Sequence, residues 1–169
     1  MNNKKTTVYL VQAAFIAALY AALTYFLEPI SFSGNQFRVA EALTILPVLT
    51  PAAVPGLTIG CIIANIASPY GVVDIICGSL ATLLAALCTR ATRNIRFKNL
   101  PVLSALFPVL FNALIVGAEI SILTTGSFNI SVFLPIAASV AFGEVVVCLL
   151  GGLPLSAALQ RTKIFEKDR

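Results

Sequence analysis

Six apolar runs separated by short polar connections account for most of the chain. A helix that crosses a bilayer needs about 20 mainly apolar residues, so this pattern predicts an all-α, polytopic membrane protein whose six transmembrane helices form one domain over residues 1–169. The second and third runs are short and contain prolines. Interrupted helices persist in lipid only where protein or a water-filled cavity satisfies their backbone groups, so we expect these two runs to pack inside the bundle. The runs cover residues 8–27, 38–49, 52–67, 72–89, 101–124 and 130–159.

Composition agrees with a lipid environment. Hydrophobic residues make up 59% of the sequence and charged residues only 11%, whereas about a quarter of the residues in a soluble domain are charged. The first run follows Lys4 and Lys5, as the core of a signal peptide would, but its 20 residues exceed the roughly 7–15 of such a core. We therefore interpret it as a permanent span. Basic residues lie at the ends of the apolar runs and not on one amphipathic face, which argues against nucleic acid as a partner.

The basic residues also predict the orientation of the chain. Ten of the 11 lie in three clusters, which precede the first run, separate the fourth from the fifth, and follow the sixth. Six spans would place all three clusters on the same side, and cytoplasmic connections carry the excess of Lys and Arg. We expect a multi-pass protein of the cell membrane with both termini in the cytoplasm, and with residues 28–37, 68–73 and 125–129 facing outward.

Several kinds of chemistry require residues that the chain lacks. It has no His, which removes Ser-His-Asp catalysis and HExxH zinc chemistry. It has no GxxxxGK[ST] loop, so we do not expect it to hydrolyse ATP in the P-loop manner. Its four cysteines lack a CxxC spacing, and we interpret them as small core or lipid-facing residues. We expect neither an enzyme nor a bound metal or cofactor. The cysteines are Cys61, Cys77, Cys88 and Cys148.

Five acidic residues lie in or beside the apolar runs, and none is on the predicted cytoplasmic side. A carboxylate inside the membrane costs about 2.5–3.5 kcal/mol on insertion scales, so each is a candidate ligand-binding residue. Glu119 lies at a depth of about 7–8 Å from the outer end of the fifth run, and Glu144 lies deeper. Neither has a basic residue nearby in sequence. The five are Glu28, Glu41, Asp74, Glu119 and Glu144.

Structural roles compete with ligand binding for some of these residues. Arg38 and Glu41 have the i, i+3 spacing of a helical ion pair. Glu28 and Asp74 sit where helix ends meet the outer interface and are candidate caps. Arg38 is also the basic residue available to the outer half of the bundle, and is itself a candidate ligand-binding residue.

Two asparagines are further candidates. Asn65 lies near the outer end of the third run, and Asn112 lies near mid-depth in the fifth, two helical turns before Glu119 on the same face. A buried amide offers two donors and two acceptor lone pairs, so it can read the edge of a planar heterocycle. An interhelical hydrogen bond is the competing role.

The first run carries a stripe of small residues at four-residue spacing. Such stripes let helix backbones approach closely in lipid. The spacing leaves two uses open, which are packing within the bundle and docking onto a separate membrane partner. The stripe consists of Ala14, Ala18 and Ala22, and Ala13, Ala17 and Ala21 lie beside it.

Two long segments carry a family resemblance. QFRVAEALTILPVLTPAAVPGLTIGCIIANI (residues 36–66) and GVVDIICGSLATLLAA (residues 71–86) resemble the queuosine-precursor transporter (QueT) family, which are substrate-binding S components of energy-coupling factor (ECF) transporters. The likeness extends over nearly the whole chain through the six-span layout, the alanine stripe and the basic inner loops. Val73 stands where the family pattern has Leu before Asp74, which is a conservative departure.

The resemblance implies a function and a set of partners. The subunit would capture a 7-deazaguanine such as 7-aminomethyl-7-deazaguanine or queuine at its outer face. It would dock through Ala14, Ala18 and Ala22 onto a scaffold membrane subunit (T component) that carries two ATPase subunits, and these would hydrolyse the ATP. Glu119 or Glu144 would accept from the guanine-like donors, and Arg38 or Asn112 would donate to the carbonyl. Another acid would bind an ammonium group.

Three other functions remain open from the sequence. An S component for another vitamin or cationic compound would use the same outer acids. A stand-alone proton-coupled exporter would use a membrane carboxylate to exchange protons with its substrate. A structural or assembly protein without a ligand would leave the intramembrane acids unexplained.

Overall fold

The computed structural model describes residues 3–27 and 38–162. All regular secondary structure within these ranges is helical apart from an isolated β-bridge between Phe97 and Leu100. The elements are α1 (Asn3–Phe26), the 3-10 helix η1 (Val39–Val48), α3 (Ala53–Asn65), α4 (Val72–Ala91), α5 (Val102–Phe111), the π-helix η2 (Asn112–Val116), α6 (Gly117–Thr125), α7 (Ile130–Val145), the π-helix η3 (Val146–Gly152) and α8 (Leu153–Thr162).

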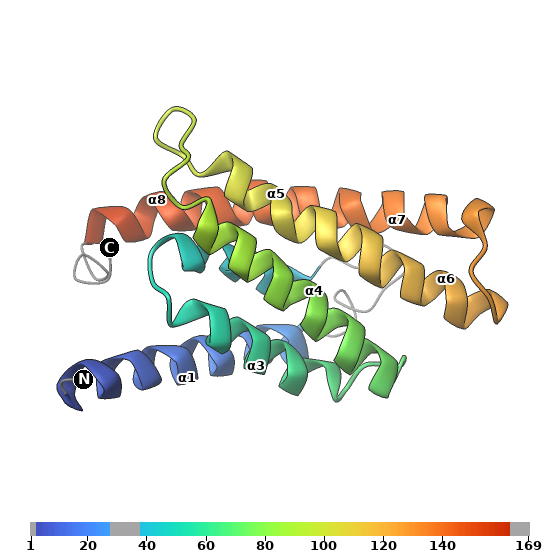
Figure 1. The fold of residues 1–169 in the computed structure, drawn as a ribbon, viewed down its shortest axis with the longest axis horizontal. Coiled ribbons are helices and arrows are strands. Elements are labelled where there is room, and N and C mark those ends of the chain that lie inside the picture. Colours follow the sequence, from blue (N-terminus) through green and yellow to red (C-terminus); the bar gives the residue numbers. More distant parts are fainter. Residues whose placement is uncertain (1–2, 28–37, 163–169) are drawn as a thin grey trace.

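These elements make up the predicted all-α polytopic bundle (Figure 1). Four continuous helices are long and apolar enough to cross a membrane, namely Lys4–Phe26, Val72–Ala91, Val102–Thr125 and Ile130–Thr162. The last two run through the π-helices η2 and η3 without a break in the helix. The second and third apolar runs form the short helices η1 and α3. The fold class is therefore confirmed, with two of the six apolar segments shorter than a regular span.

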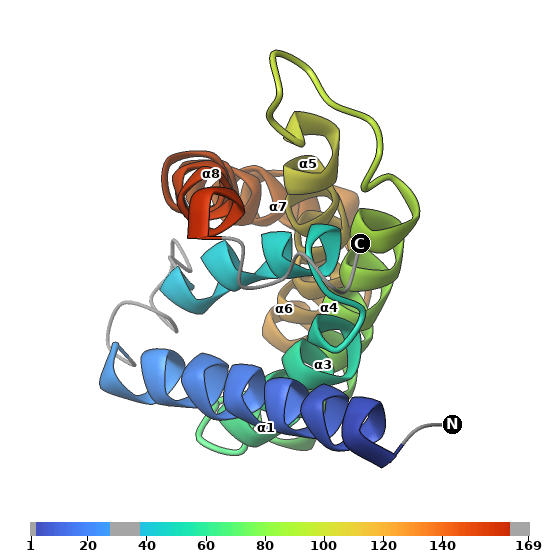
Figure 2. The same ribbon diagram turned by 90° about the vertical axis from the view of Figure 1, so that its left-hand side faces the viewer.

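The short helix η1 lies inside the bundle, as its prolines predict. Figure 2 shows it between α1 and the rod formed by α7, η3 and α8, and it also contacts α4. Leu43, Ile45, Leu46 and Val48 are at most 6% exposed. Pro47 lacks the amide hydrogen that an α-helix requires. Such an interrupted helix is tolerated here because neighbouring protein surrounds its backbone.

Helix α1 packs on α3 through glycines. A Cβ at Gly56 would lie 2.8 Å from the carbonyl oxygen of Ala13, and one at Gly60 would lie 2.8 Å from that of Ala17. Such a close approach of two backbones is possible only without a side chain. Half of the alanines in the first helix thus serve packing within the bundle.

The two alanine rows of α1 have different surroundings. Ala13, Ala17 and Ala21 are buried against the bundle, whereas Ala14 and Ala18 are exposed and Ala22 is partly exposed. The structure therefore assigns internal packing to the first row and leaves the predicted docking row on the outer surface.

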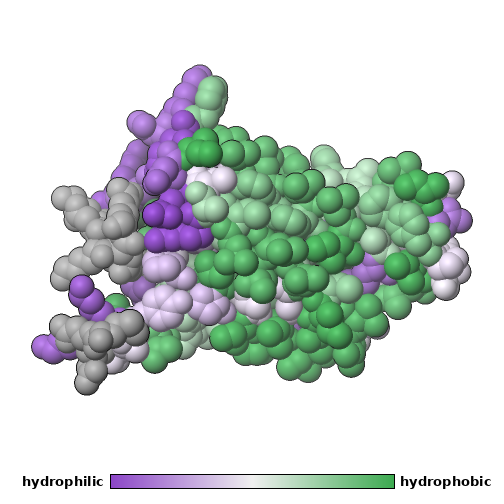
Figure 3. Space-filling view, viewed as in Figure 1, coloured by the Kyte–Doolittle hydropathy of each residue, from purple (hydrophilic) through white to green (hydrophobic). Residues whose placement is uncertain are grey.

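Polar residues gather at one end of the molecule. Figure 3 shows a hydrophilic band at this end and a broad hydrophobic belt beside it. The N-terminal end of α1, the C-terminal end of α8 and the loop between α4 and α5 all lie here, and the α3–α4 and α6–α7 turns lie at the opposite end (Figure 1). The three basic clusters thus share one end wherever they are described, as an even number of crossings requires. We call this the basic end.

Candidate functional site

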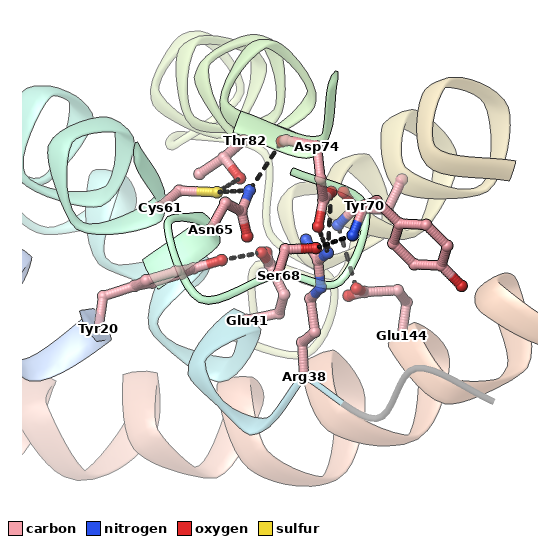
Figure 4. Close-up of polar contacts among 11 residues, drawn as sticks. Tyr20, Arg38, Glu41, Cys61, Asn65, Ser68, Tyr70, Asp74, Thr82 and Glu144 are labelled. Atoms are coloured by element: carbon pink, nitrogen blue, oxygen red, sulfur yellow. Dashed lines mark hydrogen bonds and ion pairs between the residues drawn. The ribbon is translucent and has the colours of Figure 1, made fainter. Parts of the chain in front are cut away.

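The predicted site residues converge in the interior from several helices. Each of the seven is at most 4% exposed, and most of them appear together in Figure 4. They come from the start of η1, the end of α3, the first turn of α4, η2, α6 and α7. We call this set the polar cluster, and it consists of Arg38, Glu41, Asn65, Asp74, Asn112, Glu119 and Glu144.

Arg38 and Asp74 form a buried ion pair. The Nη2 atom of Arg38 lies 3.2 Å from Oδ1 and 3.1 Å from Oδ2 of Asp74. Asp74 is 0% exposed, so the interpretation of this residue as an interfacial cap is wrong. Asp74 joins Glu41 beside Arg38, because α4 packs on η1 and brings Asp74 to the guanidinium, while Glu41 is an electrostatic neighbour of Arg38.

Asn65 joins α3 to α4. Its Nδ2 donates to the carbonyl oxygen of Asp74 at 2.9 Å and to Sγ of Cys61 at 3.4 Å. Thr82 donates to the same sulfur at 3.3 Å. This is the interhelical hydrogen bond that competes with ligand binding at Asn65, and it supports the ion pair by holding the first turn of α4 in place.

Gly78 makes room for these contacts. A Cβ at this position would lie 2.5 Å from Nδ2 of Asn65, 3.2 Å from Oδ1 of Asp74 and 3.4 Å from Nη1 of Arg38. The absence of a side chain on this turn of α4 therefore allows the amide and the ion pair to meet.

Glu41 is held by a residue that the sequence analysis missed. The hydroxyl of Tyr20 on α1 donates to Oε1 of Glu41, and both side chains are at most 1% exposed. The signal available in the sequence was a tyrosine within an alanine-rich apolar run, since a buried phenol seeks a hydrogen-bond partner. Tyr20 links the helix that carries the exposed alanine row to the polar cluster (Figure 4).

Glu144 and Asn112 contact each other across the bundle. Nδ2 of Asn112 donates to Oε1 of Glu144 at 3.1 Å, and Sγ of Cys148 lies 3.6 Å from Oε2. Asn112 begins the π-helix η2, whose i→i+5 hydrogen bonds widen the turn. The seven-residue spacing between Asn112 and Glu119 therefore does not correspond to two regular α-helical turns, and Asn112 contacts Glu144 on α7.

Glu119 differs from the other acids in having no hydrogen-bond partner within the described ranges. Both of its carboxylate oxygens are buried and unpaired there, as are Oε2 of Glu41 and Oδ1 of Asn112. Asp74 and Arg38 are its electrostatic neighbours. Buried polar atoms are nearly always paired in folded proteins, so these four acceptor atoms are the features of the cluster that invite a ligand with hydrogen-bond donors.

The polar cluster has an excess of acid. Among buried side chains of the described residues, Arg38 is the basic group that faces four carboxyl groups. Glu41 and Glu144 are electrostatic neighbours of each other. No three His, Cys, Asp or Glu side chains in the described ranges are arranged to hold a metal ion. A donor-rich or cationic organic solute suits this arrangement best. Glu28 lies outside the described residues.

These features define a class of protein, a polytopic helical membrane protein with buried, incompletely paired carboxylates. More specifically, the chain belongs to the QueT transporter family, because the family model described as "QueT transporter" matches residues 10–161. Transport and a membrane location, which the sequence predicts, agree with this membership.

One curated relative is the "Queuosine precursor transporter QueT" of Lactococcus lactis subsp. cremoris (strain MG1363). It is 40% identical to this chain over 84 residues, which are 48% of this chain and 49% of the relative. The match thus spans about half the length of that protein. No solved structure matches the chain.

Proposed function

We propose that this protein is the S component of an ECF importer and that it binds a queuosine precursor of the 7-deazaguanine type in the polar cluster. The QueT family membership and the name of the Lactococcus relative support this substrate class. Uptake would be driven by ATP hydrolysis in partner subunits, with binding from the outer side and both termini in the cytoplasm.

The observation that carries the proposal is that both buried carboxylate oxygens of Glu119 lack a hydrogen-bond partner among the residues that the structure describes. A 7-deazaguanine presents two neighbouring N–H donors to one carboxylate, and hydrogen bonds to a charged acceptor are about twice as strong as neutral ones. Glu144 is less suited to this role, because Asn112 and Cys148 already contact its oxygens.

The remaining groups of the cluster would complete the recognition. Arg38, oriented by Asp74, would donate to the ligand carbonyl, and its guanidinium offers several donors for this purpose. A 7-aminomethyl group would carry a positive charge toward Glu41 and Glu144, two neighbouring carboxyl groups. The ligand would thereby offset the excess of acid in the cluster.

Isothermal titration with 7-aminomethyl-7-deazaguanine tests the site. Glu119→Gln replaces one acceptor by a donor, and we expect affinity to fall about 10–100-fold, the loss of one or two charge-assisted hydrogen bonds. Glu144→Gln should weaken binding of this cationic ligand more than that of a 7-deazaguanine whose 7-substituent carries no amine. Glu166→Gln, the same change in the C-terminal tail, is the matched control and should bind normally. Unchanged affinity in both Glu119→Gln and Glu144→Gln would contradict the assignment.

Assembly tests the importer separately from the ligand. The exposed row of Ala14, Ala18 and Ala22 would dock on the T component, so Ala18→Leu should abolish co-purification with the scaffold and ATPase subunits and should stop uptake. Ala138→Leu makes the same change at an exposed position of α7 and should preserve both. A stand-alone exporter would be indifferent to Ala18→Leu and would purify without ATPases.

A further inference from the structure

A hollow opens at the basic end, far from the polar cluster along the helices. Its volume is about 550 Å³, much larger than a single water or phosphate needs. The end of η1, the α4–α5 loop and α8 form its walls, and Figure 3 places this loop region in the hydrophilic band beside the apolar belt. The lining residues are Val48, Arg93, Asn94, Arg96, Asn99 and Gln160.

The loop that forms one wall is a tight hairpin. Lys98 and Asn99 have φ of 49° and 64°, and the backbones of Phe97 and Leu100 exchange hydrogen bonds of 2.9 and 3.0 Å. Two consecutive left-handed residues are typical of a type I′ turn, and Asn is among the residues that tolerate this conformation. This wall of the hollow is therefore a hydrogen-bonded hairpin with a regular turn.

Arg96 connects this hairpin to α8. Its Nη1 donates to Oε1 of Gln160 at 2.9 Å and to the carbonyl oxygen of Asn99 at 3.4 Å. Gln160 in turn donates to Ser156 at 2.9 Å. A guanidinium fixed in this way is oriented before any ligand arrives, which reduces the entropy lost on binding.

Among the described residues, the charged side chains that line the hollow are both basic. Arg93 and Arg96 line it, and the sequence contains no acidic residue between Asp74 and Glu119. Amide side chains supply the remaining polar lining. Guanidinium groups with amide donors favour phosphate, because the planar fork matches the geometry of its oxygens.

Two exposed apolar side chains lie on the same loop, each next in sequence to the lining residue Arg96. Ile95 is 54% exposed and Phe97 is 68% exposed, and Nζ of Lys98 lies 5.8 Å from the centre of the Phe97 ring. An exposed aromatic and an aliphatic side chain beside a basic hollow suit the depth at which lipid head groups meet acyl chains. A freely soluble anion would gain nothing from them.

We propose that this hollow binds the phosphate head group of an anionic phospholipid, with Arg93 and Arg96 on the phosphate and Ile95 and Phe97 among the acyl chains. Basic hollows between helices on the cytoplasmic side of membrane proteins have the chemistry for such head groups. The site is independent of the transported substrate and would retain an anionic lipid at the basic end of the subunit.

Native mass spectrometry of the purified full-length protein with dioleoyl phosphatidylglycerol or phosphatidylcholine tests the proposal. The unmodified protein should bind one phosphatidylglycerol in preference to phosphatidylcholine. Each arginine near the membrane surface contributes about a fivefold gain, so Arg93→Gln with Arg96→Gln should weaken the first phosphatidylglycerol about 30-fold. Asn94→Asp, which leaves the Arg96–Gln160 contact in place, should weaken it about fivefold.

The controls separate this site from general attraction and from other occupants. Lys4→Gln with Lys5→Gln removes two charges from exposed positions at the same end, and should change the first bound lipid by less than threefold. An equal loss in the lysine and arginine variants would overturn the proposal. So would full competition by glycerol phosphate, which would identify a soluble anion. Normal lipid binding by the arginine variants, together with lost assembly on partner subunits, would identify a protein interface and equally overturn it.

Discussion

Arg38 is the residue around which the buried charges of this protein are arranged. It is 3% exposed and bound to Asp74, which is 0% exposed. Two charges removed from water are tolerable only together, because each alone keeps the full desolvation penalty. The ion pair therefore couples the start of η1 to the first turn of α4, and the ligand that we propose would meet a guanidinium already oriented.

Removing one member of this pair should destabilise the fold strongly. Asp74→Asn leaves the guanidinium buried without its counter-ion, and we expect the free energy of unfolding to fall by about 3–5 kcal/mol. Reversible unfolding in mixed micelles measures this quantity. Arg38→Gln combined with Asp74→Asn should lose clearly less than the sum of the two single changes. Additive losses would mean that the two side chains act independently.

Gly78 should also be sensitive to substitution, because it packs against Asn65 and Asp74. In Gly78→Ala the new methyl group would lie 2.5 Å from the Asn65 amide and 3.2 Å from Asp74, so these side chains must move. We expect a loss of about 1–3 kcal/mol in stability and weaker binding of 7-aminomethyl-7-deazaguanine. Ile76→Ala, at a position of α4 that is 63% exposed, is the control and should change neither. Normal ligand binding by Gly78→Ala would show that the cluster tolerates this displacement.

At the scale of elements, α1 has two faces with different tasks. The buried face carries Ala13 and Ala17 against the glycines of α3 and Tyr20 against Glu41. The outer face carries Ala14 and Ala18, which are exposed.

A substitution that crowds the buried face of α1 should lower stability, whereas one on its outer face should not. Gly60→Ala would place a methyl group 2.8 Å from the Ala17 carbonyl oxygen and 2.8 Å from Cβ of Tyr20, which forces α1 away from α3. We expect a loss of about 1–3 kcal/mol, measured by unfolding in micelles. Ala18→Leu on the outer face should stay within about 0.5 kcal/mol of the unmodified protein. A reversed order of the two effects would contradict the division of the helix.

At the scale of the whole molecule, charge is distributed along the long axis. Apart from the buried Arg38, the basic residues of the described ranges lie toward the basic end, where Figure 3 shows the hydrophilic band. The acids of the described residues are buried in the interior. This asymmetry is the physical basis for the proposed orientation, since Lys and Arg remain on the cytoplasmic side.

Labelling with a membrane-impermeant maleimide on intact cells tests that orientation. A cysteine introduced at Ser127, in the α6–α7 turn, should react from outside, whereas one at Lys98, in the α4–α5 loop, should react only after permeabilisation. The unmodified protein, whose four cysteines lie within helices, is the background control. Reaction of both added cysteines from the same side would refute the proposed crossing pattern.

Local properties of the sequence determined much of this protein. The apolar runs predict the helices to within a few residues, and the prolines predict that η1 is short and internal. These features follow from the sequence because lipid exposure and backbone hydrogen bonding act on each segment separately.

Only the tertiary structure decided the pairings within the polar cluster. Arg38 pairs with Asp74, Asn112 with Glu144, and Tyr20 with Glu41. Partners separated by 21–36 residues depend on which helices are neighbours and on how a π-helix turns the residues that follow it. Composition and periodicity carry no information about which helices are neighbours or about how a π-helix turns the residues that follow it. The sequence therefore determined which side chains are buried in the membrane, and the packing of the helices decided which of them meet.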